Sequence, residues 1–482
     1  MAFVSQLRRR DASPSLVLLV VCAGVVLASL DLFIVNVALP EMARDLDAPL
    51  SSLSWVLNGY AIAFASLLVL FGRLAERRSR ELGFLVGVLV FTLASAACGL
   101  ATSVEALVAF RVVQGAGAAL LTPASLSLVL ATAPDERRHS SVRAWTAVGG
   151  LAAALGPVVG GLLVAVDWRW VFLVNVPIGL GALYVGWRRL PNVPGHPVPR
   201  PDALGAGLLS AGVAGLTLAL VRGEEWGWDS TATLGTLGIS AALVTVFVGH
   251  CLRARNPLVE PALFRAGGFA GSSIVMTLFS VSFGAMLLSL VLWMQDVWGW
   301  SALATGLAVA PGPLMVPLFS FLVAGRLIAR FGPAPVVTAG MTIFALGLGW
   351  WVAAVQVEPD YVGTLLGGML LTGIGVGLTL PTLMATAAGS LPPRAFATGS
   401  AVVNMLRQVG LALGVALLVA LLGRPESSDA ALTAFRTGWL VLAAIALAGA
   451  VVAAVLLRTK AEVPAAEILT AEPAVPATRL RR

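Results

Sequence analysis

The chain is poor in the residues that soluble enzymes and nucleotide-driven pumps use. Its single lysine, Lys460, lies outside any glycine pattern, and a P-loop needs a lysine to reach phosphates, so we expect no ATP-binding site. The histidines His139, His196 and His250 lack metal-ligand spacing, and no nucleophile–base arrangement is visible. The three cysteines are dispersed and imply no disulfide framework. We therefore expect no enzymatic activity, no cofactor and no metal.

Charge is almost absent from the apolar runs that make up most of the chain. Hydrophobic residues are 58% of the sequence and charged residues 11%, outside the range of soluble domains. Fourteen apolar runs are long enough to cross a bilayer, and because lipid leaves no partner for backbone polar groups, we expect helices. Their interiors hold three charged side chains, Asp31, Arg111 and Arg407. Each is a candidate functional residue because a charge in hydrocarbon is costly.

These runs predict an all-α integral membrane protein. The predicted spans cover residues 16–39, 53–72, 82–101, 104–127, 143–166, 170–187, 203–221, 232–252, 269–294, 302–324, 334–357, 361–388, 397–422 and 437–457. The N-terminus resembles a signal peptide, with arginines at positions 8 to 10 ahead of an apolar stretch. We interpret that stretch as a retained first helix, because it is long enough to span the membrane.

Basic residues alternate between successive loops. With the N-terminus inside, 24 of the 31 basic residues fall in cytoplasmic segments, five at external ends and two within spans. The positive-inside rule then predicts that both termini are cytoplasmic. This anchoring accounts for the net charge of +7, so no nucleic-acid partner is expected. The excess of arginine over lysine is typical of a GC-rich bacterial genome, and we expect a multi-pass protein of the bacterial plasma (inner) membrane.

A pattern of glycine and proline recurs in the two parts of the chain, at an offset of 258 positions. The recurring pairs are Gly115 and Gly373, Gly117 and Gly375, Pro123 and Pro381, and Gly156 and Gly414. The turn 72–74 also recurs at 325–327. Such a repeat indicates a transporter built of two six-helix halves, here flanking a two-helix insert. The predicted segments are a cytoplasmic N-terminus 1–15, an N-terminal half 16–190, a linker with two inserted helices 191–255, a C-terminal half 256–458 and a disordered cytoplasmic tail 459–482.

Four segments carry a resemblance that covers nearly the whole chain. They are the stretch from Leu30 to Pro40, the loop 72–77, the stretch 111–117 and the stretch 156–161. With them the chain resembles the fourteen-spanner drug:proton antiporters of the major facilitator superfamily. The first and last are fairly specific for drug antiporters, whereas the loop marks only the superfamily. Residues 407–410 are also similar to the thirteenth helix of that family.

The resemblance implies the major facilitator fold and proton-coupled export of drug-like lipophilic compounds or antibiotics by alternating access. The expected partners are a small-molecule substrate, protons and the lipid bilayer, and we expect a monomer. The same machinery would serve an exporter of one endogenous metabolite, siderophore or lipid. A non-transporting receptor or a membrane enzyme is a remote alternative, which predicts a soluble domain or a catalytic constellation that the sequence lacks.

Asp31 and Arg111 lie at equal predicted depth. Each is seven residues from the external end of its span, or roughly 10 Å deep at the helical rise per residue. Burial raises the pKa of an acid and a nearby arginine lowers it, so an acid held between these effects can exchange a proton. Gln114 lies one turn from Arg111 on the same face. We predict that Asp31 carries the proton and Arg111 tunes it; the alternative is a permanent ion pair.

The stretch 72–81 is predicted to be a charged loop between the second and third spans. It holds four arginines and two glutamates, which could lock helix ends through charged pairs; simple positive-inside anchoring is the alternative. The candidate gating residues are Gly72, Arg73, Glu76, Arg77 and Arg80. The family pattern has aspartate in place of Glu76 and glycine in place of Ser79, which leaves the geometry of the turn open.

In the fifth span, small residues recur at helical spacing. The stripe comprises Gly149, Ala153, Gly156 and Gly160, with Pro157 and Gly161 beside it. Such a stripe lets helices approach closely, and a proline can kink the helix within it. The resemblance implies that this bend distinguishes exporters from importers; ordinary helix packing is the alternative.

Arg407 lies near the middle of the thirteenth span, with no acid in the second half of the chain to meet it. It is expected either to bond carbonyls of neighbouring helices or to contact Asp31 or substrate across a central cavity. Asn36 and Gln408 are further candidates for substrate contact. One acid against two arginines disfavours multiple cationic charges, so we predict neutral, zwitterionic or monocationic lipophilic substrates. Efficient export of a dicationic dye would contradict this prediction.

Overall fold

The structure is a computed structural model that describes residues 13–195, 201–392 and 395–457. The predicted tail and all but the last three residues of the predicted N-terminal segment lie outside this range. Within it, fourteen helices are long and apolar enough to cross a membrane, which confirms the predicted number of spans. The regular secondary structure of the described residues is helical throughout.

The first eight spans comprise the N-terminal half and the insert. Their helices are α2 (Pro14–Asp45), α3 (Leu50–Arg78), α4 (Arg80–Gly99), α5 (Val104–Thr132), α6 (Asp135–Val164), the pair α7 (Trp170–Leu173) and α8 (Asn175–Arg189), α9 (Ala203–Trp226) and α10 (Thr231–Arg253). Several begin at a side chain that caps the helix by accepting a backbone hydrogen bond. Ser79, Ser103 and Asp202 do so at the starts of α4, α5 and α9.

The last six spans follow a short 3₁₀ turn, η1 (Pro261–Arg265). Their helices are α11 (Gly267–Leu292) with η2 (Trp293–Val297), the broken series α12 (Ala302–Val309), α13 (Pro311–Phe319), η3 (Ser320–Ala324) and α14 (Gly325–Phe331), then α15 (Pro333–Ala354), η4 (Tyr361–Leu365) with α16 (Leu366–Gly389), α17 (Phe396–Leu422) and α18 (Ser428–Leu456). The tenth span is broken near Pro311 and Pro317, because proline removes a backbone donor from the helix.

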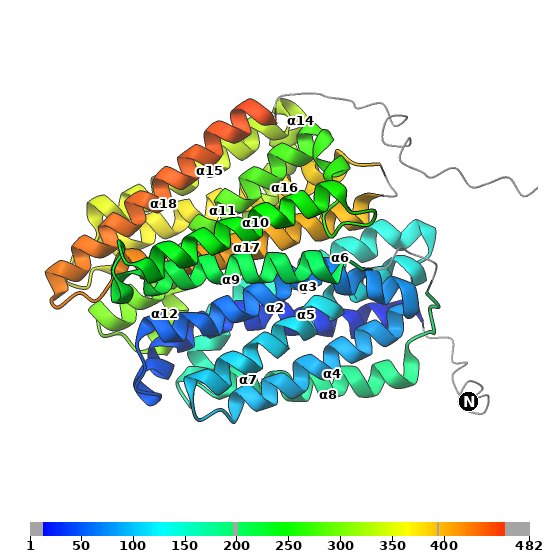
Figure 1. Cartoon of the computed structure of the whole chain (residues 1–482), viewed down its shortest axis with the longest axis horizontal. Helices are drawn as coiled ribbons and strands as arrows, with labels where there is room; N and C mark the ends of the chain where they lie inside the picture. The colour runs from blue at the N-terminus through cyan, green and yellow to red at the C-terminus, as the bar shows by residue number, and fades with distance from the viewer. Residues whose placement is uncertain (1–12, 196–200, 393–394, 458–482) are drawn as a thin grey trace, which may run out of the picture.

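The recurring glycines occupy equivalent places in the two halves. In Figure 1 the N-terminal half lies below the C-terminal half. A side chain at Gly115 of α5 would collide with α3, and one at Gly373 of α16 with α13, the corresponding helix of the second half. Gly117 and Gly375 likewise meet α4 and α15. The constant offset in sequence therefore reflects one packing arrangement used twice, as expected for two pseudo-repeats.

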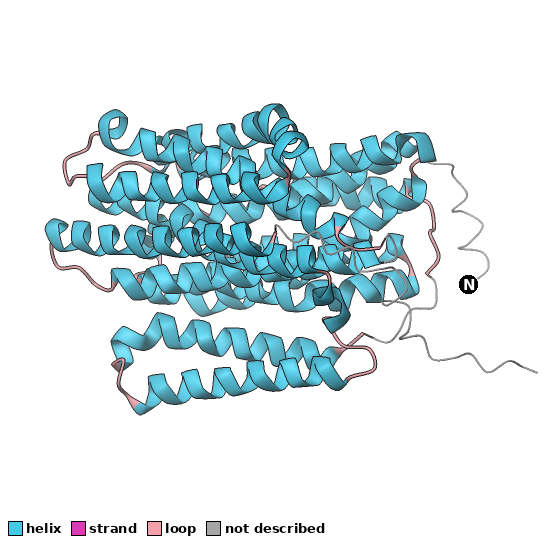
Figure 2. Cartoon of the chain, turned by 90° about the horizontal axis from the view of Figure 1, so that it is seen from above, coloured by secondary structure: helices cyan, strands magenta, loops and turns pink. Residues whose placement is uncertain are grey.

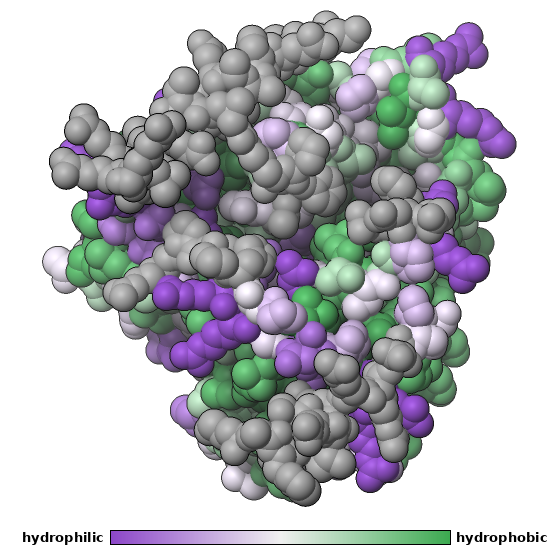
Figure 3. Space-filling model, turned by 90° about the vertical axis from the view of Figure 1, so that its right-hand side faces the viewer, coloured by the Kyte–Doolittle hydropathy of each residue, from purple (hydrophilic) through white to green (hydrophobic). Residues whose placement is uncertain are grey.

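The bundle has two ends with different side chains. The arginine end, on the right of Figure 1, is where α2 begins and residues 73–80 lie; the opposite end, where α2 finishes, is called the far end. Figure 3 looks onto the arginine end and shows hydrophilic side chains among apolar ones. The insert helices α9 and α10 form a separate layer, the lower pair in Figure 2, and α9 packs on both α3 and α17.

Candidate functional site

Asp31 of α2 lies at the centre of a buried hydrogen-bond network inside the N-terminal half. Its Oδ2 forms an ion pair with Nη1 of Arg111 on α5. Its Oδ1 accepts hydrogen bonds from Nε2 of Gln114, at 2.8 Å, and from Nδ2 of Asn175, at 3.0 Å. These four side chains have no solvent exposure. Asp31 and Arg111, placed at equal depth from the sequence, are thus in direct contact, and Gln114 hydrogen-bonds to both of them.

Arg111 is held from several sides. Its Nη1 also donates to Oε1 of Gln114 at 2.6 Å, and its Nε donates to the carbonyl of Val56 on α3 at 2.9 Å. The guanidinium lies 4.2 Å from the centre of the Tyr60 ring, a distance at which the ring face attracts a cation. Its Nη2 has no hydrogen-bond partner among the described residues. The arginine is therefore fixed in place, and its charge has Asp31 as its counterion.

Two members of this network were missed in the sequence. Asn175 begins α8 and donates to Asp31, while Ser95 of α4 accepts from Gln114 at 2.7 Å. Neither carries a charge, so a search for charged residues in apolar runs passes over them. Asn175 could have been identified from the sequence, because an amide buried in an apolar span is costly and the sequence holds only six asparagines.

The stretch 72–81 differs from its prediction as a loop. Helix α3 continues to Arg78 and α4 begins at Arg80, so Gly72, Glu76 and Arg77 are helical and one residue separates the helices. The apolar run ends before the helix does, because arginines sustain a helix that extends beyond the apolar layer. Ser79 is extended, with φ of −164°, and any residue adopts this conformation, so the turn needs no glycine.

Arg73 links the two halves at the arginine end. Its Nη1 donates to the carbonyl of Pro257 at 3.1 Å, and its Nη2 contacts Oε1 of Glu260 at 2.8 Å. Both partners lie in the segment between α10 and α11, at the entrance to the C-terminal half. Within the described part of the chain, Glu76 and Arg77 form no ion pair. Of the charged residues predicted to form a gate, Arg73 is thus the one that bridges the halves.

The small-residue stripe of α6 makes two different contacts. Gly149, Gly156 and Gly160 face α2 within the same half; a Cβ at Gly156 would lie 2.6 Å from Cβ of Phe33. Gly161 instead faces the other half, where a Cβ would lie 2.6 Å from the carbonyl oxygen of Ala302 in α12. The backbone of Pro157 also touches this helix, at Gly306. The stripe therefore packs one half together, and Gly161 and Pro157 beside it join the two halves at the far end.

The far end is closed by further contacts between the halves. Nε2 of Gln295 in η2 donates to the carbonyl of Val37 in α2 at 3.0 Å, and both residues are buried. Leu50 and Trp55 of α3 pack with Ala416 of α17 and Val221 of α9 in one apolar cluster. Closure at this end thus uses apolar packing and a hydrogen bond from a side-chain amide to a backbone carbonyl.

The second-half candidates do not join the Asp31 network. Arg407 is half-buried in α17, and among the described residues it forms neither an ion pair nor a hydrogen bond to a carbonyl. Its neighbour Gln408 is buried, with Oε1 unpaired within the same part of the chain. Asn36 donates to the carbonyl of Leu32 at 3.1 Å. The ion pair of Asp31 is thus made within its own half, by Arg111.

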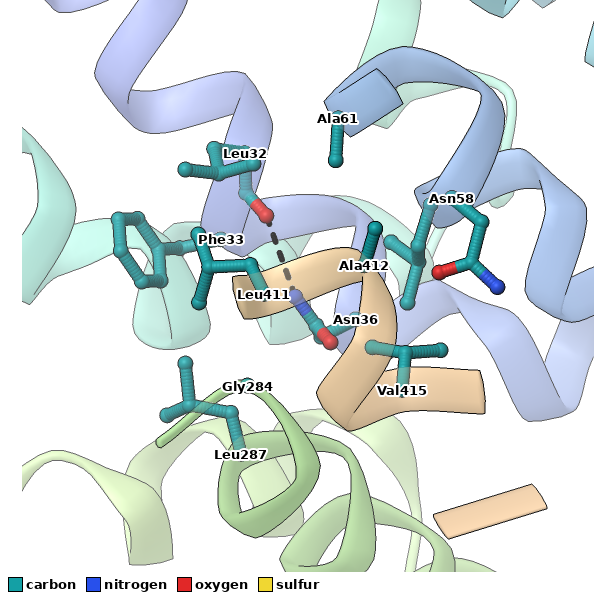
Figure 4. Close-up of a pocket in the computed structure, with 11 residues that line it drawn as sticks. Leu32, Phe33, Asn36, Asn58, Ala61, Gly284, Leu287, Leu411, Ala412 and Val415 are labelled. Atoms are coloured by element: carbon teal, nitrogen blue, oxygen red, sulfur yellow. Dashed lines mark hydrogen bonds between the residues drawn. The ribbon is translucent and has the colours of Figure 1, made fainter. Parts of the chain in front are cut away.

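A small cavity lies between the halves toward the far end (Figure 4). Its volume is about 30 Å³, and its walls come from α2 and α3 on one side and from α11 and α17 on the other. The lining residues are Leu32, Phe33, Asn36, Leu57, Asn58, Ala61, Gly284, Leu287, Leu411, Ala412 and Val415. None of them carries a charge. The predicted candidate Asn36 therefore does face the interface between the halves.

The sequence profile of the Major Facilitator Superfamily matches residues 21–293 and 273–482. The chain belongs to the Major Facilitator Superfamily. Among its superfamily relatives, a tetracenomycin C resistance and export protein of Streptomyces glaucescens is 35% identical over 406 residues, 83% of this chain and 74% of that protein. A cephamycin export protein of Amycolatopsis lactamdurans is also 35% identical, over 89% of each chain. The predicted resemblance to exporters of this superfamily is thereby confirmed.

Solved structures show the same superfamily fold at low sequence identity. An auto-inhibited peptide transporter of the POT family has a TM-score of 0.68 with 18% identity, and the match covers 92% of this chain and 96% of that one. At this identity the likeness concerns the fold alone. In this superfamily member, the two halves meet closely at the far end, and the buried Asp31 network lies within the first of them.

Proposed function

We propose that the chain exchanges protons for drug-like lipophilic molecules, which it exports across a bacterial plasma membrane by alternating access. The observation that supports this most directly is the complete burial of Asp31 with three side-chain donors. An acid in an apolar span is a functional group by default, and here its neighbours can stabilise the ionised form until they move. The relatives named for antibiotic export suggest the substrate class.

In this proposal, Asp31 carries the proton and Arg111 favours its ionised state. Protonation removes the charge that holds Nη1 of Arg111, so the arginine would then rely on Gln114 and the Val56 carbonyl. Because α2 carries Asp31 and also contacts α11 and α12 of the other half, a shift of α2 would couple proton binding to the interface. Gln114 and Asn175 hold the carboxylate in position.

The gates lie at opposite ends of the bundle. At the arginine end, the pair of Arg73 with Glu260 would break as the halves separate there; at the far end, Gly161 would leave Ala302 as they separate on that side. The excess of basic residues supports a cytoplasmic location for the arginine end and for both termini. We further propose that the chain acts as a monomer with domain boundaries as predicted, and that Arg407 and Gln408 face the transport path.

The test uses everted membrane vesicles that contain a pH-sensitive dye and are energised by respiration. Proton release on addition of tetracenomycin C or puromycin, lost in Asp31→Asn, would support proton exchange at this residue. A variant that still exchanges protons at the wild-type rate would refute the role of Asp31. No response of the wild type across a broad panel of antibiotics would refute drug export by this chain.

A dedicated exporter of one natural product is the second candidate. It is favoured by the relatives whose names specify a single compound, tetracenomycin C or cephamycin. Competition separates the two functions: a broad exporter transports several unrelated compounds that inhibit one another, whereas a dedicated exporter responds to one. Neutral and monocationic members of the panel should be transported more efficiently than dications.

A further inference from the structure

Asn58 differs from the other asparagines of the membrane spans. Asn36 and Asn404 each donate to a carbonyl of their own helix, and Asn175 donates to Asp31. Asn58 of α3 has no solvent exposure, yet neither its amide nitrogen nor its amide oxygen has a hydrogen-bond partner among the described residues. It lines the cavity between the halves, which Ala412 and Val415 of α17 line from the other half (Figure 4).

An unpaired buried amide destabilises a protein, since it has lost its hydrogen bonds to water. A leucine of similar size would avoid that cost in this apolar wall. From the position of this amide on a cavity between the two halves, we propose that Asn58 recognises an uncharged hydrogen-bonding group of the exported molecule. The inference rests on the proposed export function and adds the residue and the chemistry that select the substrate.

The lining of the cavity specifies the chemical class. An amide side chain both donates and accepts hydrogen bonds, so it suits a carbonyl, a hydroxyl or an amide. No ionisable residue lines the cavity, so a charged group placed here would lose its hydration without gaining a counterion. The remaining walls are aliphatic apart from Phe33 and the amide of Asn36. The ligand is therefore a lipophilic molecule that presents an uncharged polar group at its edge.

The size of the cavity sets which part of the ligand it holds. Its volume of about 30 Å³ admits one or two water-sized groups, whereas drug-sized ligands occupy sites of roughly 300–1,000 Å³. In this arrangement the cavity thus accommodates a polar edge and not a whole molecule. Two walls belong to each half, so separation of the halves enlarges the site. Asn58 lies two residues from Val56, whose carbonyl holds Arg111, so the proton site and this amide share one helix.

The experiment compares the purified wild type with Asn58→Leu, Asn58→Ser and a matched control, Thr217→Val. The Thr217 hydroxyl is also buried and unpaired among the described residues, but it lies on α9 and does not line the cavity. Binding of tetracenomycin C, methylenomycin A and puromycin is measured by quenching of tryptophan fluorescence. Transport of the same probes is measured in proteoliposomes, and the thermal midpoint Tm of each variant is recorded.

We expect Asn58→Leu to raise the Kd for an uncharged probe roughly tenfold, the change expected from losing a hydrogen bond to the ligand. Its Tm should equal or exceed that of the wild type, Asn58→Ser should recover part of the affinity, and Thr217→Val should change neither. An unchanged Kd, whether or not the Tm is lowered, would show that the amide has no role in ligand binding and would overturn the inference. A wild type that neither binds nor transports any probe would overturn the proposed export function, and this inference with it.

Discussion

The Asp31–Arg111 pair predicts a specific pattern of stability in a double-mutant cycle. Both side chains lack solvent exposure, so removal of one charge leaves the other buried without a counterion. Such a change typically costs about 3–5 kcal/mol in the free energy of unfolding. In Asp31→Asn the remaining oxygen can still accept from Gln114 and Asn175, but the new amide cannot accept from Nη1 of Arg111. We therefore expect a loss near the lower end of that range, about 3 kcal/mol.

Removal of both charges gives the decisive comparison. In Asp31→Asn combined with Arg111→Met, no buried charge remains, and apolar replacements of a buried ion pair are often neutral. The double variant should recover most of the stability. Since each single change costs about 3 kcal/mol or more, the coupling energy should be about 5 kcal/mol. Asp45→Asn is the matched control, because its pair with Arg169 is 42% and 30% exposed and such pairs contribute about 0–1 kcal/mol.

The assay is reversible unfolding in mixed micelles, followed by tryptophan fluorescence at neutral pH, with proton exchange measured on the same variants. The double variant should be stable yet inactive in proton exchange, since it has regained packing without regaining an acid. If Asp31→Asn lowers the free energy of unfolding no more than Asp45→Asn does, the burial of the Asp31–Arg111 pair seen in the structure is contradicted. A double variant that exchanges protons normally would refute the role of Asp31 as the proton carrier.

Three further predictions concern the ends of the bundle. Gly161→Leu should abolish transport at normal expression, because the larger side chain prevents the halves from closing at the far end. Cysteines introduced at that end should then be labelled more strongly. Unchanged transport would contradict the prediction. Arg73→Glu should impair transport, and the charge swap that adds Glu260→Arg should restore it, as measured by uptake into everted vesicles. Failure of the swap would show that Arg73 does not act through its pair with Glu260. Burial raises the pKa of Asp202, but backbone hydrogen bonds and His250 outweigh it, so the pKa lies below its ordinary value. The ionised form therefore stabilises the start of α9 at neutral pH, and this contribution is lost as the pH falls through the lowered pKa. In chemical denaturation, Asp202→Ala should lower the free energy of unfolding by about 1 kcal/mol at pH 7 and by less once the pH is below the lowered pKa. An equal loss at both would refute this assignment.

The membrane architecture could be predicted because its physical causes are written in the sequence. Apolar length sets the number of spans, and the glycines at positions 115 and 373 mark equivalent close contacts. The equal depth of Asp31 and Arg111 could also be read from the sequence, and it made their contact possible without showing that their helix faces meet. These features depend on local composition and on one dimension, the position along the membrane normal.

What the sequence could not provide depends on which helix faces lie together. Asn175 and Ser95 join the Asp31 network only because α8 and α4 present those faces to α2. The continuation of α3 through Arg77 was missed because apolar length measures the lipid-facing part of a helix and not its end. The partner of Arg73 was equally inaccessible, since Glu260 is 187 residues away in sequence. The roles assigned to Arg407 and Gln408 stay predictions.

The insert lies on one side of the bundle, so the two sides of the protein that face the lipid differ. One seam between the halves, formed by α3 and α17, is covered by α9, while the seam of α6 with α12 and α13 lies away from the insert. A compound dissolved in the bilayer can therefore approach the interface sideways along the second seam but meets a helix at the first. The two additional helices thus cover one of the two pseudo-symmetric seams and leave the other facing the lipid.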